Sequence, residues 1–280
     1  MPDQQPGHSA ASNAGDASDC WGRLNDVADI SPILSILDTL PAGFRAARRA
    51  MLAHLALGRD SRVLEAGCGP GTALVDLVEL IGPEGRITGI DPTLALVEQA
   101  RARAKAAHIS HVSYGVGDIR RIEPADSAFD AAFCDKILVH VSPVSQAIAE
   151  LARVTRSGGR VGVVEWFSQG MMIAADAAAT RRVLDGSAPA GALNPVVPLE
   201  LEHRLGAAGL ADIQAGSVVA ESHEFLPSLK VMLRRRVQQA IDLQAITSVD
   251  GDAWLHELDA RAREGRFYWA ALVRWATGRR

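Results

Sequence analysis

The stretch Val63-Leu64-Glu65-Ala66-Gly67-Cys68-Gly69-Pro70-Gly71-Thr72 decides the fold of this chain. A short apolar run over residues 62–64 precedes the glycines, and apolar residues recur at helical spacing from 73 to 81. The glycines therefore fall in a turn from a buried parallel strand to a helix. There the missing side chains allow a ligand to approach the backbone, and the free N–H groups at the start of the helix point toward it.

A second strand, and the acidic residue that ends it, narrow the choice of ligand. Residues 86–90 are predicted to form a second strand, and Asp91 follows it. A carboxylate in this place accepts both hydroxyls of a ribose. The glycines have the spacing G-x-G-x-G and not the G-x-G-x-x-G of dinucleotide sites. Glu65 disfavours a pyrophosphate and favours a cation at close range. The turn therefore predicts a positively charged nucleoside and disfavours a nicotinamide dinucleotide.

The segment Glu65-Ala66-Gly67-Cys68-Gly69-Pro70-Gly71 resembles the first motif, E/D-x-G-x-G-x-G, of the class I methyltransferases that use S-adenosylmethionine (SAM). SAM carries a ribose, an adenine, a sulfonium and an ammonium group, and its product is S-adenosylhomocysteine (SAH). Segments 114–119, 129–135 and 153–161 resemble the later strands of that family in the required order. The resemblance covers roughly residues 62–167 and implies that the cofactor contacts Glu65, Gly67, Cys68, Gly69, Gly71, Asp91, Pro92, Asp118, Ile119, Cys134 and Asp135.

In this family an acid after the third strand holds the adenine amino group, and an apolar neighbour covers the ring. Asp118 and Ile119 take those places. The resemblance is strongest to the ubiquinone and menaquinone C-methyltransferase-like branch, through the segments 136–141 and 163–166. That branch includes many enzymes of secondary metabolism, so a quinol-like or other secondary metabolite is the expected substrate.

Alternating strands and helices predict a doubly wound, Rossmann-like α/β sheet. The resemblance implies seven strands, mostly parallel, with the last one antiparallel. We divide the chain into a disordered tail over 1–20, an N-terminal helical cap over 21–60 and a methyltransferase domain over 61–280. The cap contains helical patterns over 30–40 and 44–57. Within the domain, the long connection 168–198, with a helical stretch over 171–184, is predicted to be a lid over the site.

Composition limits the possible partners. Forty-eight per cent of the 280 residues are hydrophobic, which suits a packed core, and a net charge of −4 gives no general attraction to nucleic acid. The three cysteines, Cys20, Cys68 and Cys134, are too dispersed to suggest disulfides or a metal site. No secretory leader or membrane span is recognisable. We expect a cytoplasmic protein that binds a small-molecule substrate and no metal, nucleic acid or membrane, as a monomer or a homodimer.

The catalytic candidates follow the fourth and fifth strands. Methyl transfer needs alignment, and a general base where the attacking atom carries a proton. His140 is the preferred base, and Glu165, expected to face the mouth of the site, is the second catalytic candidate; Asp135 and Tyr268 are weaker ones. The structural alternatives are a backbone hydrogen bond for His140 and a rim hydrogen bond for Glu165. Lys136 has the alternative of an ion pair with Asp135.

The predicted function is methyl transfer from SAM to an oxygen, nitrogen or carbon nucleophile of a small molecule. Two alternatives stay open at this point. One is a SAM-binding enzyme on the same fold that does not methylate, such as a cyclase or a decarboxylase. The other is a macromolecular methyltransferase, although Cys134-Asp135-Lys136-Ile137 does not resemble the N-P-P-Y element of amide and exocyclic amine methylation.

Overall fold

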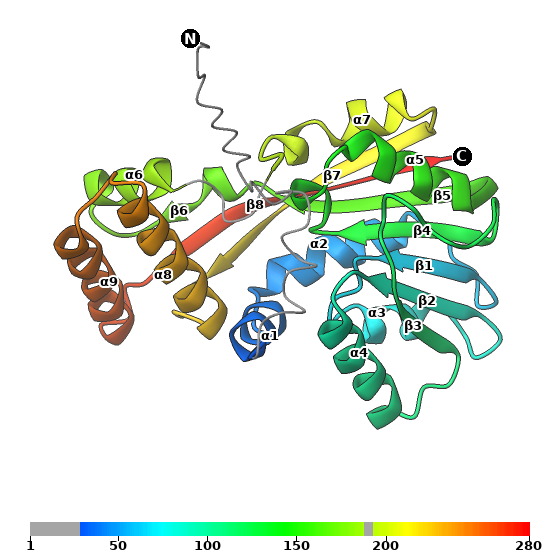
Figure 1. Cartoon of the computed structure of the whole chain (residues 1–280), viewed down its shortest axis with the longest axis horizontal. Helices are drawn as coiled ribbons and strands as arrows, with labels where there is room; N and C mark the ends of the chain where they lie inside the picture. The colour runs from blue at the N-terminus through cyan, green and yellow to red at the C-terminus, as the bar shows by residue number, and fades with distance from the viewer. Residues whose placement is uncertain (1–28, 188–192) are drawn as a thin grey trace, which may run out of the picture.

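The computed structural model describes residues 29–187 and 193–280, so the tail over 1–20, the start of the cap and positions 188–192 of the predicted lid lie outside the described residues. One twisted sheet forms the centre of the described chain, in the order β3-β2-β1-β4-β5-β8-β6, with β7 paired to β8 (Figure 1). The strands are β1 (Arg62–Ala66), β2 (Arg86–Asp91), β3 (Val112–Val116), β4 (Phe129–Asp135), β5 (Thr155–Trp166), β6 (Met172–Ile173), β7 (Ala211–Ser222) and β8 (Trp269–Arg279).

The first five strands are mutually parallel, and β8 runs antiparallel to β5, β6 and β7. This confirms the doubly wound α/β fold and the antiparallel last strand. The described part of the sheet has eight strands and not seven, because the two residues of β6 add a short pairing to β8. Since β1 lies between β2 and β4, the chain leaves β1 at a switch point, where such sheets bind ligands.

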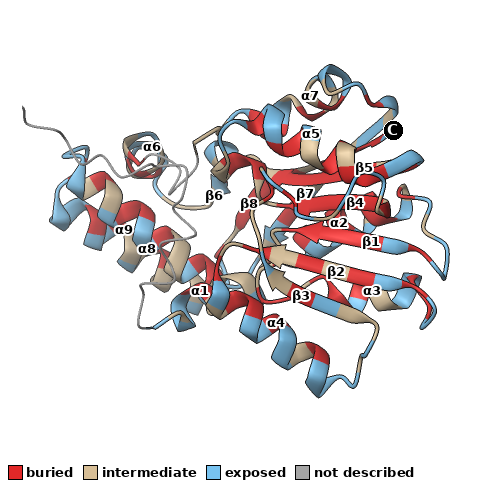
Figure 2. Cartoon of the chain, turned by 45° about the vertical axis from the view of Figure 1, so that its right-hand side comes forward, coloured by how far each residue is buried: buried red, intermediate tan, exposed pale blue. Residues whose placement is uncertain are grey.

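Helices cover both faces of the sheet, and the central strands β1 and β4 are mostly buried, whereas the edge strand β3 is more exposed (Figure 2). One apolar core includes Phe44, Met51 and Trp269, and the other, on the opposite face, includes Leu64, Cys134 and Leu151. The described helices are α1 (Ser31–Asp38), α2 (Ala42–Ala53), α3 (Leu74–Leu80), α4 (Leu94–Ala106), α5 (Val144–Val154), α6 (Ala177–Gly186), α7 (Leu201–Ala207), α8 (Pro227–Asp242) and α9 (Ser248–Arg263), with short 3-10 turns η3 (Leu138–His140), η4 (Ser168–Gly170) and η5 (Val197–Leu199).

The cap helices α1 and α2 lie close to their expected positions, but the predicted lid differs from expectation. Its helix begins at Ala177 and not at 171, because Met172 and Ile173 pair with β8 and the Asp176 side chain caps the helix by accepting a hydrogen bond from the Ala179 N–H. Figure 1 shows α6 grouped with α8 and α9 beyond the parallel part of the sheet, and α6 packs against both helices. A long pairing of β7 with β8 carries this helical group away from the parallel strands.

Candidate cofactor and acceptor site

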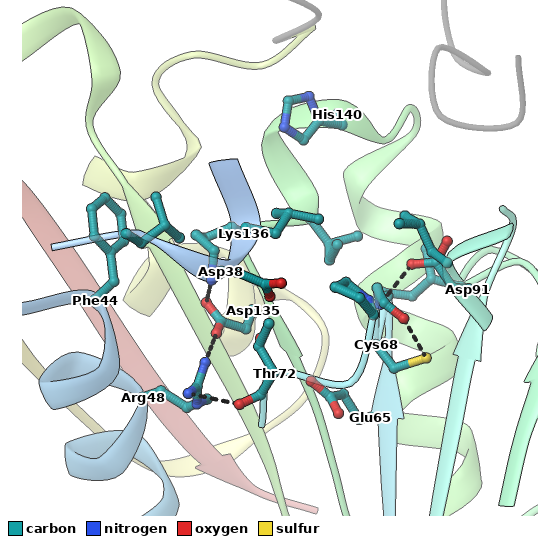
Figure 3. A pocket seen from close by; sticks show the side chains of 18 of the residues that line it. Asp38, Phe44, Arg48, Glu65, Cys68, Thr72, Asp91, Asp135, Lys136 and His140 are labelled. Atoms are coloured by element: carbon teal, nitrogen blue, oxygen red, sulfur yellow. Dashed lines mark hydrogen bonds and ion pairs between the residues drawn. The ribbon is translucent and has the colours of Figure 1, made fainter. Parts of the chain in front are cut away.

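A cavity of about 440 Å³ opens at the carboxyl ends of β1, β2 and β4. Its walls come from the glycine turn, from the turn after β4 and from α1 and α2, so segments far apart in the sequence meet in it (Figure 3). Leu37 of α1 lies over the glycine turn, 3.9 Å from the point where a Cβ on Gly69 would stand. None of the described residues of 168–198, which are 168–187 and 193–198, lines this cavity.

The glycine turn has the backbone that the sequence requires. Gly67, Gly69 and Gly71 all have φ between +51° and +80°, which glycine adopts without strain. A Cβ on Gly67 would stand 2.3 Å from Cδ1 of Ile137, so only glycine fits against the turn after β4. Gly67, Cys68 and Gly69 line the cavity. Gly71 does not line the cavity, which differs from the expected cofactor contact. It faces Ala100 of α4 instead, where the absence of a side chain permits close packing of the helix.

Glu65 brings a buried carboxylate to the floor of the cavity. Its residue is 2% exposed, and its Oε2 has no hydrogen-bond partner among the described residues. Burial raises the pKa of Glu65 to about 8, although the positive charge of Arg48 opposes this shift. A buried oxygen without a partner is costly. A cationic ligand in the cavity would remove that cost and favour the ionised carboxylate.

Asp91 and its neighbour shape the next part of the wall. The two carboxylate oxygens of Asp91 accept hydrogen bonds from the backbone N–H groups of Gly69 and Thr93, each at 2.9 Å. Burial raises the pKa of Asp91, against the lowering effect of these two donors. Both Asp91 and Pro92 line the cavity. The same carboxylate therefore fixes the glycine turn and faces the ligand space.

Asp118 and Ile119 line the cavity beyond Asp91, as the resemblance implied. Asp118 forms an ion pair of 2.7 Å with Arg120. Burial acts to raise the pKa of Asp118, but hydrogen bonds from Arg120 and its positive charge hold that pKa below its ordinary value. The Ile119 side chain is buried and supplies apolar surface at this end.

Two neighbouring residues at the end of β4, both expected to contact the cofactor, face opposite sides of the sheet. Asp135 lines the cavity, whereas Cys134 is fully buried in the core on the other face of the sheet. Successive side chains of a strand point to opposite faces. The Cys134 side chain therefore does not reach the cavity, which corrects the expected contact with the cofactor. Burial raises the pKa of the Cys134 thiol well above its ordinary value.

Asp135 is held by two cations. Its Oδ2 lies 3.1 Å from Nη1 of Arg48, and its Oδ1 lies 2.7 Å from Nζ of Lys136. Arg48 also reaches Asp76 at 2.8 Å. The predicted pairing of Lys136 with Asp135 is thus present, while Arg48 and Asp76 were not anticipated. A signal for Arg48 did exist: it lies on the apolar face of α2, in helical register with Phe44 and Met51.

The two catalytic candidates lie in different surroundings. His140, at the end of η3, lines the cavity. Glu165 does not line it: this side chain is fully buried beneath the turn after β4, where its Oε1 accepts a 2.5 Å hydrogen bond from the Leu138 N–H. Burial raises the pKa of Glu165 to about 8 despite that hydrogen bond. Its expected position at the mouth is a correction, because β5 ends deeper in the molecule than the turn above it.

The remaining base candidate, Tyr268, also lies outside the cavity lining, and its hydroxyl donates to Glu221. Over residues 29–187 and 193–280, no group of three or more His, Cys, Asp or Glu side chains is arranged to hold a metal ion. In the same ranges no helix has the length and apolar character needed to cross a membrane.

Comparison with known proteins gives the family of the central segment. Residues 63–159 match the model of a methyltransferase domain. A 37.1 kDa uncharacterised protein of transposon TN4556 from Streptomyces fradiae is 31% identical over 235 residues, which are 81% of this chain and 66% of that protein. The SAM-dependent Diels-Alderase iccD of Talaromyces variabilis is 37% identical over 119 residues, or 41% of this chain and 39% of that protein. The chain thus spans less than two thirds of the length of these relatives.

The solved structures agree on the architecture. The YcgJ protein of Bacillus subtilis superposes with a TM-score of 0.61 at 18% identity, covering 84% of this chain and 98% of that one. This likeness concerns the fold, which is the same Rossmann-like sheet with flanking helices. The comparisons therefore agree on a Rossmann-like fold, and residues 63–159 match a methyltransferase domain.

Proposed function

We propose that this chain is an enzyme that binds SAM in the cavity and transfers its methyl group to an oxygen, nitrogen or carbon nucleophile of a small molecule. One observation carries the proposal. The floor of the cavity presents the Oε2 of Glu65, buried and without a hydrogen-bond partner among the described residues, beside a glycine turn that Asp91 holds in place. This arrangement suits a cationic nucleoside and disfavours the pyrophosphate of NAD.

The lining residues offer a partner for each part of SAM in this proposal. Asp91 and Pro92 would face the ribose, Asp118 and Ile119 the adenine, and Glu65 with Asp135 the charged methionine part. When bound, SAM supplies an electrophilic methyl group on a sulfonium. The chain supplies positioning and excludes water, and such alignment contributes about 7 to 11 kcal/mol to lowering a barrier.

His140 is the residue that we propose as general base. It lines the cavity from the turn after β4, on the same wall as Lys136 and away from Asp91 (Figure 3). Replacing it with alanine should leave the SAM dissociation constant nearly unchanged and lower turnover about a hundred- to ten-thousand-fold for an acceptor that must lose a proton. Unchanged turnover with such an acceptor, measured at saturating SAM, would remove His140 from the mechanism.

The acceptor class follows from the size and lining of the cavity. A cavity of about 440 Å³ has the size of a small-molecule site. The resemblance of residues 136–141 to the quinone-methylating branch supports a quinol-like or other secondary metabolite. A cytoplasmic location and a monomeric or homodimeric state remain predictions from the sequence.

A second candidate function is SAM-dependent cyclisation without methyl transfer. The similarity to a SAM-dependent Diels-Alderase over 119 residues favours it specifically. In such a role the bound cation acts electrostatically, and the same cavity would serve. No observation on the described residues favours a macromolecular acceptor.

Incubation with SAM and a panel of phenols, quinols and amines tests the proposal. Mass spectrometry should find an acceptor that gains one methyl mass, together with a stoichiometric amount of SAH. An Asp91→Ala sample serves as the binding-deficient control, and Asp252→Ala, at an exposed position, serves as the matched control. Rearranged acceptor without SAH would support the cyclase, and methyl transfer only to added protein or RNA would overturn the small-molecule assignment.

A further inference from the structure

The end of the cavity nearest Phe44 carries more positive than negative charge. Lys136 and Arg48 share the carboxylate of Asp135. Arg48 also shares Asp76 with Arg45 and Arg49, and Arg49 reaches Glu79 at 3.0 Å. This connected network contains four cations and three carboxylates, so it has a surplus of one positive charge.

The other charged groups around the cavity do not neutralise that surplus. Asp38 pairs with Arg103 at 2.6 Å, and Asp118 pairs with Arg120 at 2.7 Å, so these two pairs are balanced. Two further carboxylates, Glu65 and the buried Glu165, interact with Lys136, but burial raises the pKa of each to about 8, so both hold a proton below that pH. In that range the network around Asp135 keeps one surplus positive charge, and Lys136 brings it to the wall of the cavity.

Lys136 is the member of the network that can reach a ligand. Arg48 is held by Asp76, Asp135 and the carbonyl of Thr72, which it contacts at 3.3 Å. Lys136, whose side chain is 15% exposed, lines the cavity. If its ammonium turns from Asp135 to a ligand, Asp135 keeps Arg48 as a partner, so no buried carboxylate is left alone.

The backbone of Lys136 is held in an uncommon conformation. Its φ is +64°, a region that residues with a side chain occupy only under constraint. Its N–H donates to the carbonyl of Val164 at 2.7 Å, and two residues later the Leu138 N–H donates to the buried Glu165. These two hydrogen bonds to β5 fix the turn after β4 and place Lys136 in the wall of the cavity.

Apolar residues line the cavity beside this cation. The Lys136 Nζ lies 6.0 Å from the centroid of the Phe44 ring, and Leu40, Pro41 and Ala42 line the same end. The Phe44 ring packs edge-on against Trp166, with centroids 5.7 Å apart, so its own position is fixed. A flat ring that carries a negative oxygen would satisfy both surfaces, as the ring packs on the apolar wall and the oxygen meets the ammonium.

We propose that the part of the cavity lined by Lys136 and by the segment Leu40, Pro41 and Ala42 is the acceptor subsite, that it selects planar aromatic acceptors bearing an ionised hydroxyl, and that Lys136 determines this specificity. This inference rests on the proposed function, because it assigns the acceptor to the part of the cavity that SAM is not proposed to occupy. It makes phenolates, as distinct from aromatic amines, the preferred ligands.

Binding of 4-nitrophenol and of its amine counterpart 4-nitroaniline tests this assignment. Both are titrated at saturating SAH, at a pH where free 4-nitrophenol is ionised, and the nitrophenol absorbance reports its ionisation state when bound. We expect the phenolate to bind at least about tenfold more tightly than the amine. Lys136→Met should reduce that preference to less than about threefold, whereas Lys136→Arg should retain it. Lys105→Met, an exposed position on α4, serves as the matched control.

Each outcome separates this inference from the proposed function. Titration with SAH comes first for every variant, together with a melting curve: failure of the folded wild-type protein to bind SAH would overturn the proposed function itself. If SAH binds and the two aromatics bind equally, or neither binds, the acceptor subsite is wrong. If Lys136→Met folds, binds SAH and keeps the full preference for the phenolate, the role of Lys136 is wrong.

Discussion

At the scale of single residues, the site depends on two carboxylates with different partners. Asp91 accepts two backbone N–H groups, whereas Glu65 keeps one oxygen without a partner among the described residues. Both carboxylate oxygens of Asp91 therefore have hydrogen-bond partners before a ligand binds. The Oε2 of Glu65 gains a partner only when a cation binds beside it. This difference gives each residue its own measurable signature.

Asp91→Ala should raise the SAM dissociation constant at least about tenfold, equivalent to roughly 1.4 kcal/mol. The physical reason is the loss of the ribose acceptor together with the hydrogen bond that holds Gly69. Isothermal titration measures the change, with Asp252→Ala as the exposed control. An unchanged affinity in folded Asp91→Ala protein would show that this carboxylate does not face the ribose.

SAM affinity should increase with pH and level off above about 8. Because burial raises the pKa of Glu65 to about 8, the free protein holds a proton there at lower pH, and a bound cation favours its release. Titration in two buffers of different ionisation enthalpy should therefore detect proton release on binding below pH 8. Glu65→Gln should bind more weakly and without that release; equal proton release by the variant would assign the linkage to another group.

At the scale of elements, the turn after β4 decides which residues meet the ligand. Strand alternation directs Asp135 to the cavity and Cys134 to the opposite core, and β5 fixes the following turn through Val164 and Glu165. Glu165 thus acts on the site through the backbone of residues 136–140. We regard it as a positioning residue.

Glu165→Gln should make the stability less dependent on pH. Burial raises the pKa of Glu165 from 4.5 to about 8, so the folded state binds the proton more tightly than the unfolded state. The wild-type free energy of unfolding therefore falls as pH rises from about 4.5 to 8, by up to about 1.4 kcal/mol per pH unit for this group. Denaturant unfolding at several pH values should show a shallower fall for Glu165→Gln and no change for the exposed Glu123→Gln. Parallel curves for wild type and Glu165→Gln would contradict the buried placement.

Local patterns predicted most of the elements but not every side-chain direction. The glycine turn and Asp91 could be placed because each follows directly from a strand end or a required backbone conformation, whereas Asp118 was placed only through the family resemblance. Cys134, Gly71 and Glu165 could not, because their facing depends on the alternation and depth of strands that pair only in the folded sheet. Phe44 and Arg48 reach the site from the cap, and helical periodicity alone does not give the contacts between a cap and a sheet.

At the scale of the whole molecule, the cavity joins the parallel sheet to the helical parts around it. The carboxyl ends of β1, β2 and β4 provide the cofactor side, and α1 and α2 close the opposite side. α1 in turn packs on α8, where the Ser228 hydroxyl donates to the carbonyl of Thr39 at 2.7 Å. α8 thus supports the cap helix α1, and α6 and α9 pack against α8 in turn.

The central claim is that this cavity binds an adenosyl cation, and isothermal titration of the full chain with SAM, SAH and NAD tests it most directly. We expect SAM and SAH to bind, with no detectable binding of NAD at the same concentrations. Absence of binding by either adenosyl ligand to protein that shows a cooperative melting transition would contradict it, as would preferential binding of NAD.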